Sequence, residues 1–339
     1  MLVTVLLFIL GLVFLIFGGD WFVDGAVGIA ERLRLPEVLI GATVVSIGTT
    51  LPEVMVSAES AVMGHGEIAY GNAIGSVICN TALILALTIA IRPAKAERKD
   101  ILLSSVFFLI AVVIYIVSAY IFQTFSRVTG IMLLVVFAVY MVISVRKSLL
   151  IFRAQRGGTP SVIENEAPAE EDKPKGLIGR FKKTVAGMIV MLIIGAALIS
   201  IGADLLIDNG IVIANALHVP ESVIALTFVA LGTSLPELVT AITSLVKGHG
   251  SLSLGNIVGA NLFNLVLVSG LSITISPFSV PAEKTIAGIN SSLLVDIPLM
   301  VVVMAIAIIP VLIKNKLNRV QGIILLVLYA LFCVYQFAF

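Results

Sequence analysis

The sequence predicts an all-α integral membrane protein with ten transmembrane helices, arranged as two inverted five-helix repeats. Three observations lead to this fold class. Of the 339 residues, 59% are hydrophobic and only 12% are charged, which is about half the charged share of a soluble domain. Apolar stretches of about 20 residues, long enough to cross a bilayer, recur along the chain. The third observation is a strong internal repeat.

The apolar stretches predict ten membrane-spanning segments. Helices are expected because every backbone polar group must find its partner inside the segment when lipid surrounds it. The predicted spans are residues 2–18, 38–62, 68–91, 100–121, 128–146, 184–203, 221–246, 252–275, 293–313 and 319–338.

The basic residues predict how these helices are oriented. If the segment between the fifth and sixth helices is cytoplasmic, 19 of the 21 Lys and Arg residues lie on the cytoplasmic side, and only Arg127 and Lys284 lie outside. Short cytoplasmic loops of membrane proteins are enriched in Lys and Arg. We therefore expect a multi-pass protein of the cell (plasma) membrane with both termini outside.

The internal repeat divides the chain into two halves. Residues 36–93 align without a gap with residues 220–277, at an offset of 184, and 24 of the 58 positions are identical. The predicted organisation is a first repeat at 1–146, a cytoplasmic linker at 147–183 and a second repeat at 184–339. Because each repeat has an odd number of helices, the second enters the membrane upside down. Inverted repeats of this kind typically place a substrate site near the bilayer midplane.

The strongest repeated block is Gly-Thr-(Thr/Ser)-Leu-Pro-Glu, at residues 48–53 and 232–237, and both copies lie inside predicted spans. A carboxylate at the bilayer centre costs about 3 kcal/mol on insertion scales, so it indicates a functional site. The two carboxylates, Glu53 and Glu237, need a cation or a proton to neutralise them. The alternative is that both are protonated and purely structural, which would have to hold twice.

Hydroxyl-bearing residues share a helical face with each glutamate. Ser46, Thr49 and Thr50 precede Glu53 at spacings that place all four on one face. The second half repeats this pattern with Ala230, Thr233, Ser234 and Glu237. Hydrogen bonding back to helix carbonyls is the alternative role for these hydroxyls.

A proline precedes each glutamate. Pro52 and Pro236 donate no hydrogen bond and clash with the carbonyls of Gly48 and Gly232, so we expect each helix to kink or partly unwind there. Carbonyls, hydroxyls and a carboxylate would then converge. Such an all-oxygen environment suits hard cations such as calcium and sodium.

A second repeated block, Gly-Asn-x-x-Gly at residues 71–75 and 255–259, lies on the next helix of each half. The glycine spacing lets membrane helices approach closely. Ser76 and Asn80 follow one turn apart and could face the glutamates, and Asn264 could do so from the second half. For Ser76, a role in helix packing is the alternative.

At these blocks the sequence resembles the cation/calcium antiporter superfamily, and most closely its prokaryotic sodium/calcium exchanger branch. The resemblance covers essentially the whole chain. The proton/calcium branch typically has a different, Asn-containing motif before its glutamate, so its absence favours sodium as the coupling ion. Some members have Ser and Asp where this chain has Ala260 and Asn264.

The resemblance implies a set of cation ligands. Glu53 and Glu237 would be the central carboxylates shared by calcium and sodium, and Ser46 and Ala230 would contribute main-chain carbonyls. The remaining implied or candidate ligands are Thr49, Thr50, Thr233, Ser234, Ser76, Asn80 and Asn264.

The predicted function is secondary active exchange of calcium for sodium, by alternating access at a midplane carboxylate site. We expect a monomer that contacts calcium, sodium and the lipid bilayer, with no cofactor, no enzymatic activity and no nucleic acid. Calcium/proton exchange is the first alternative. A cation channel is a weaker one, because no ring-forming filter motif is visible.

Overall fold

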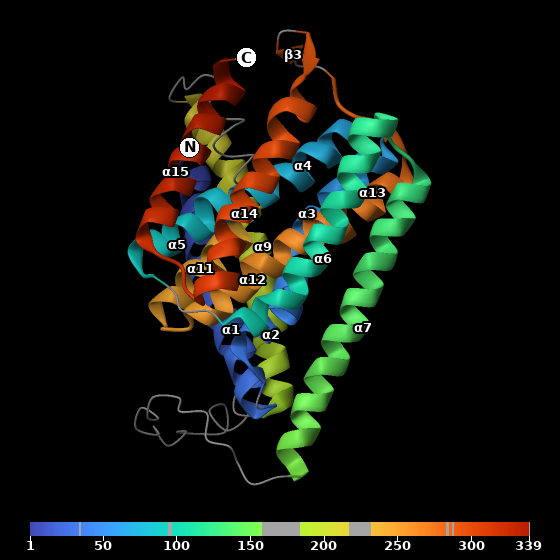
Figure 1. The fold of residues 1–339 in the computed structure, drawn as a ribbon. Helices are drawn as coiled ribbons and strands as arrows, with labels where there is room; N and C mark the ends of the chain where they lie inside the picture. The colour runs from blue at the N-terminus through green and yellow to red at the C-terminus, as the bar shows by residue number, and fades with distance from the viewer. Residues whose placement is uncertain are drawn as a thin grey trace.

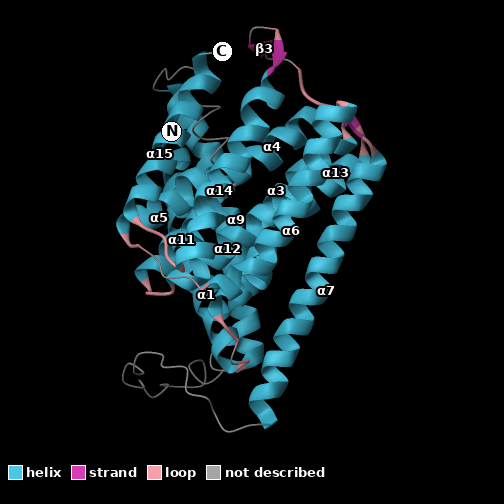
Figure 2. Cartoon of the chain, in the orientation of Figure 1, coloured by secondary structure: helices cyan, strands magenta, loops and turns pink. Residues whose placement is uncertain are grey.

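The computed structural model describes residues 1–33, 35–93, 97–157, 184–216, 232–282, 285–286 and 288–338. Over these ranges the chain is almost entirely helical (Figures 1 and 2). Both chain ends lie in the upper half of the view in Figure 1, whereas the long helix α7 ends at the bottom.

The first half contains seven α-helices and three short π-helical segments. The π-helical segments continue neighbouring α-helices. The elements are α1 (Leu2–Arg32), α2 (Glu37–Ile40), η1 (Gly41–Val45), α3 (Ser46–Val62), α4 (Gly66–Cys79), η2 (Asn80–Leu85), α5 (Ala86–Ile91), α6 (Arg98–Ile116), η3 (Val117–Phe122) and α7 (Arg127–Gly157).

The described part of the second half follows the same order. Its elements are α9 (Val185–Ala216), α11 (Leu235–Val246), α12 (Gly250–Phe263), η5 (Asn264–Val268), α13 (Ser269–Ile275), η6 (Ser292–Asp296), α14 (Ile297–Lys314) and α15 (Arg319–Ala338).

Four two-residue strands complete the described fold. Strand β1 (Thr124–Phe125) pairs antiparallel with β2 (Phe278–Ser279), so one strand from each half meets in a small sheet. Strand β3 (Thr285–Ile286) pairs antiparallel with β4 (Ile289–Asn290).

Nine helices within the described ranges are long and apolar enough to cross a membrane. Of the seventh predicted span, 221–246, only Leu235–Val246 is described as a helix, and residues 217–231 lie outside the described ranges. The all-helical, multi-pass membrane architecture is therefore confirmed.

Three predicted spans are shorter than the helices observed. The first span was expected to end at residue 18, but α1 continues to Arg32. The helix continues past its two acidic residues because Lys247 Nζ lies 3.2 Å from Asp20 Oδ1 and 2.7 Å from Asp24 Oδ1. Similarly, α9 extends beyond residue 203 to Ala216, and α7 extends to Gly157, past the predicted start of the linker.

Glycines allow α1 and α9 to pack closely and antiparallel. A Cβ at Gly195 would lie 2.5 Å from the Phe22 nitrogen, and one at Gly25 would lie 2.7 Å from the Met188 carbonyl oxygen. Two further contacts, Gly18 with Gly195 and Gly11 with Gly202, exchange with each other when 184 is added to or subtracted from each number. Any side chain at these positions would push the two helices apart.

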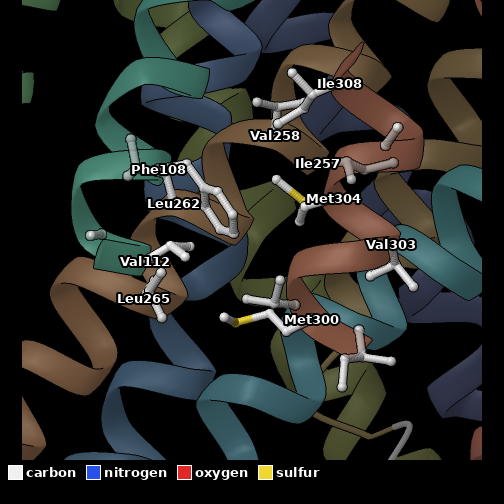
Figure 3. Close-up of a cluster of buried hydrophobic side chains, with 14 of the residues drawn as sticks. Phe108, Val112, Ile257, Val258, Leu262, Leu265, Met300, Val303, Met304 and Ile308 are labelled. Carbon is white, nitrogen blue, oxygen red and sulfur yellow. The ribbon is translucent and has the colours of Figure 1, made fainter. Parts of the chain in front are cut away.

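Helix α12 lies at the centre of the hydrophobic core. Every residue from Leu252 to Phe263 is buried. Figure 3 shows its apolar side chains between those of α6, such as Phe108, and those of α14, such as Met300 and Met304. The element that carries the second repeated Gly-Asn block is therefore held on several sides at once.

Candidate cation site

The repeated blocks fold into equivalent elements at the offset seen in the sequence. Helices α4 and α12 both begin and end 184 residues apart, and the π-helical segments after them begin at Asn80 and Asn264. The turns before them contain Gly64 and Gly248, with φ of 82° and 89°, a conformation that favours glycine. The two halves therefore present Asn80 and Asn264 from matching positions.

Glu53 and Glu237 are both completely buried. Glu53 lies on α3 and Glu237 in the first turn of α11, and each is 0% exposed. The Glu53 carboxylate lies within the field of the Glu237 carboxylate. Among the described residues, none of their four oxygens has a hydrogen-bond partner and neither forms an ion pair. Burial of two such groups without compensation is strongly unfavourable.

Hydroxyl groups surround Glu237. Thr49 and Thr50 of α3 lie next to its carboxylate, although the Thr50 hydroxyl forms no hydrogen bond of ordinary geometry. Ser234, immediately before α11, is 2% exposed, and its hydroxyl is likewise unpartnered within the part of the chain described. These groups are available to a ligand because the fold does not use them.

The amides of Asn80 and Asn264 complete the set of unpartnered groups. Both side chains are 0% exposed, and neither the amide oxygen nor the amide nitrogen has a partner in the described ranges. Segment η5, which begins at Asn264, packs against α3, while η2, which begins at Asn80, packs against α11. Each asparagine is thus carried by a segment that contacts the glutamate helix of the other half.

The two prolines act differently from each other. Helix α3 runs without interruption through Pro52, so the expected unwinding does not occur there, and the irregular turns lie earlier, in η1. One missing hydrogen bond is tolerated because neighbouring helices hold the segment. In the second half, residues 232–234 form a turn and Pro236 lies in the first turn of α11, where a missing N–H costs nothing.

The other predicted residues lie at varied positions. The Ser46 hydroxyl donates to the Gly41 carbonyl at 2.7 Å and to the Asn256 carbonyl at 2.9 Å, so its side chain is committed to the fold. Ser76 is buried on α4. Ala230 lies outside the described residues.

The sequence model of the sodium/calcium exchanger protein family matches residues 3–146 and 187–338. The chain belongs to this family.

Individual relatives and solved structures of this family cover nearly the whole chain. The sodium/calcium exchanger MaX1 of Methanosarcina acetivorans is 31% identical over 357 residues, covering 99% of each chain. The inner membrane protein YrbG of Escherichia coli K12 is 35% identical over 277 residues, covering 82% of this chain and 81% of its own.

A solved structure of the sodium-calcium exchanger NCX_Mj, soaked with zero Na⁺ and Ca²⁺, superposes with a TM-score of 0.76 at 30% identity over 99% of each chain. Another, soaked with Na⁺ and Sr²⁺, gives 0.75 at 31% identity over 97% of each chain.

Two residues of this exchanger-family chain that the sequence analysis did not select lie directly behind the candidate ligands. Thr49 Oγ1 donates to Asn256 Oδ1, and Thr233 Oγ1 donates to Asn72 Oδ1, both at 3.2 Å. The two hydrogen bonds exchange at the offset of 184. Both asparagines belong to the repeated Gly-Asn block, so their place in the repeat was the available signal.

Proposed function

We propose that this chain exchanges Ca²⁺ for Na⁺ across the membrane by alternating access, with both ions binding between Glu53 and Glu237. The observation that carries the proposal is the pair of buried carboxylates, which lack hydrogen-bond partners and counter-charges among the described residues. Membership of the sodium/calcium exchanger family supports it.

The chemistry of the surrounding groups favours hard cations. Ca²⁺ takes roughly six to eight oxygen ligands, and carboxylate, hydroxyl and amide oxygens all qualify. Glu53 and Glu237 together balance one Ca²⁺, and the oxygens of Thr50, Ser234 and Asn80 can complete its coordination. The remaining proposed ligands are Thr49, Thr233, Asn264, Ser76 and the main-chain carbonyls of Ser46 and Ala230.

Antiport follows from competition for one pair of charges. Na⁺ and Ca²⁺ need the same two carboxylates, so they bind alternately. When the site is empty, the buried carboxylates carry a large unfavourable free energy. Reorientation without cargo is therefore penalised, which couples the two fluxes.

An inverted-repeat arrangement supports alternating access. We infer that residues 1–146 and 184–339 form the two repeats and that residues 147–183 connect them. The antiparallel packing of α1 on α9 supports the inversion. The turn before α4 contacts Phe278, whereas the turn before α12 contacts the end of α1 and the start of α2. Equivalent turns thus have different surroundings, as expected if they lie on opposite sides of the membrane.

We further infer that the chain functions as a monomer in a prokaryotic plasma membrane, with both termini outside. One chain supplies both carboxylates, so the site needs no second copy. The distribution of Lys and Arg supports the orientation.

The test is ⁴⁵Ca²⁺ uptake into proteoliposomes that contain the purified chain. We expect uptake to require internal Na⁺ and to be abolished in the Glu53→Gln and Glu237→Gln variants. The matched control is Glu59→Gln, because Glu59 lies on the same helix but is exposed. Uptake driven by an acidic interior without Na⁺ would instead indicate proton coupling, and uptake that needs neither gradient would overturn the antiport proposal.

A further inference from the structure

Asn72 and Asn256 lie behind the candidate site rather than in it. Asn72 is on α4 and half-buried, and Asn256 is on α12 and 0% exposed. Each accepts a hydrogen bond from a threonine of the opposite half. The two contacts are related by the repeat offset, so the same device occurs twice.

The hydrogen bonds of Asn72 determine which way its amide faces. Its Nδ2 lies 3.2 Å from the main-chain oxygen of Glu53 and 2.8 Å from Ser57 Oγ. A carbonyl oxygen can only accept, so this side of the amide must be the NH₂ group. The opposite atom, Oδ1, faces Thr233 and has no proton to give. Thr233 must therefore be the donor.

This assignment determines what the threonine offers to a cation. A hydroxyl has one proton to donate and two lone pairs with which to accept. When the proton is directed at an asparagine oxygen, the lone pairs face away from that asparagine. A cation needs such lone pairs, whereas a proton pointed at it would repel it.

The same reasoning applies to Thr49, which lies beside Glu237. Its proton is directed at Asn256, so it meets the Glu237 carboxylate with lone pairs. Two acceptors that face each other repel, and a cation between them relieves the repulsion. The main chain at Asn256 also accepts a hydrogen bond from Ser46 at 2.9 Å, which ties α12 to the start of α3.

We propose that Asn72 and Asn256 are positioning residues that direct the hydroxyl protons of Thr233 and Thr49 away from the cation. This inference rests on the proposed function, because it assumes that cations bind at these threonines. Partners that orient the direct ligands of a metal change its affinity by about 10- to 100-fold when they are removed. Because each hydrogen bond joins the two halves, full affinity requires both halves to be in place.

A double-mutant cycle on Ca²⁺ binding tests the proposal. The Ca²⁺ dissociation constant is measured on the purified full chain, without Na⁺, for wild type, Asn256→Leu, Thr49→Val and the double variant. We expect each single variant to raise the dissociation constant about 10- to 100-fold. The double variant should be no weaker than Thr49→Val, because Asn256 acts through Thr49. Full multiplication of the two effects, or wild-type affinity in Asn256→Leu, would overturn the proposal.

The matched control is Asn261→Leu. Asn261 is also on α12 and fully buried, but its Nδ2 donates to Thr81 Oγ1 at 2.7 Å, away from the candidate site. We expect this variant to lower the unfolding temperature and to keep the Ca²⁺ dissociation constant within twofold of wild type. A loss of affinity equal to that of Asn256→Leu would show a general packing effect and overturn the proposal.

If Asn256→Leu fails to fold, the half-buried pair of Asn72→Ala and Thr233→Val provides the same cycle with the same expected outcomes. Binding is measured without Na⁺ gradients, so this test is separate from the test of exchange. Intact coupling between the variants without Na⁺-driven uptake would refute the exchange proposal alone.

Discussion

Thr50 shows how a side chain can be available to a cation without contributing hydrogen bonds to the fold. It is 1% exposed, and its hydroxyl has no hydrogen-bond partner of ordinary geometry among the described residues. An unused buried hydroxyl is unfavourable for folding. We therefore attribute its presence to ion binding, which can be tested against a threonine that the fold does use.

We expect Thr50→Ala to raise the KM for Ca²⁺ in Na⁺-driven uptake by about tenfold, which corresponds to the loss of one contact with a charged partner. The unfolding temperature should change little, because no hydrogen bond is lost. The control is Thr43→Ala, since the Thr43 hydroxyl bonds back to the Leu39 carbonyl at 2.8 Å. Equal KM values for the two variants would contradict this role for Thr50.

At the residue scale, the sequence predicted the charged groups but not the groups that position their neighbours. Glu53 and Glu237 stand out because a carboxylate inside an apolar span is costly wherever it lies. The partner of Thr49, by contrast, is Asn256, which is 207 residues away. No local pattern connects them, so only the folded chain reveals the hydrogen bond.

Helices α1 and α9 form the longest packed pair of elements. Their contact depends on glycine, since the Gly195 Cα lies against the Phe22 backbone. In a membrane such close packing supplies much of the attraction between helices, because lipid is as apolar as the side chains.

We expect Gly195→Val to destabilise the chain by about 1–3 kcal/mol, as overpacking typically does. The measurement is the unfolding temperature of the detergent-purified protein. Ile193→Val on the same helix is the control, because Ile193 is exposed at the outer surface and should tolerate the change. An unfolding temperature for Gly195→Val that matches the control would show that α1 and α9 need not approach so closely.

The ends of elements were harder to predict than their existence. The first predicted span stopped at residue 18, before Asp20 and Asp24, as a purely local interpretation suggests. Helix α1 continues because Lys247, from a distant turn, pairs with both carboxylates. Similarly, Pro52 was expected to break its helix, but tertiary packing maintains α3 through it.

At the scale of the whole molecule, an ion pair joins the start of α2 to the turn before α12. His249 Nδ1 lies 2.8 Å from Glu37 Oε1, and Ser251 donates to Glu37 Oε2 at 2.6 Å. The hydrogen bond to Glu37 raises the pKa of His249. Burial opposes this increase, and the charges of Glu37, Glu31 and Asp24 add to it.

The raised pKa predicts how stability depends on pH. The protonated form of His249 is favoured in the folded state, so its contribution is fully present below the unfolded pKa of about 6.5. It is lost as pH rises through the higher folded pKa. We expect the unfolding temperature to decrease from about pH 6 to pH 9, and to decrease less in His249→Gln.

The control for this prediction is His65→Gln, at the equivalent position of the first half. No ion pair with a carboxylate is found for His65 within the described ranges. This variant should keep the wild-type pH dependence. A His249→Gln curve parallel to wild type would exclude His249 as the titrating group.

The sequence by itself determined the membrane class, the repeat and the two central glutamates. Hydropathy and a buried charge have large, local energetic consequences that appear directly in the order of residues. The tertiary structure alone decided which helices continue past polar residues and which amides orient the threonines. Those outcomes depend on partners from the other half of the chain, such as Lys247 for α1 and Asn256 for Thr49. Such partners become neighbours only when the two halves pack together.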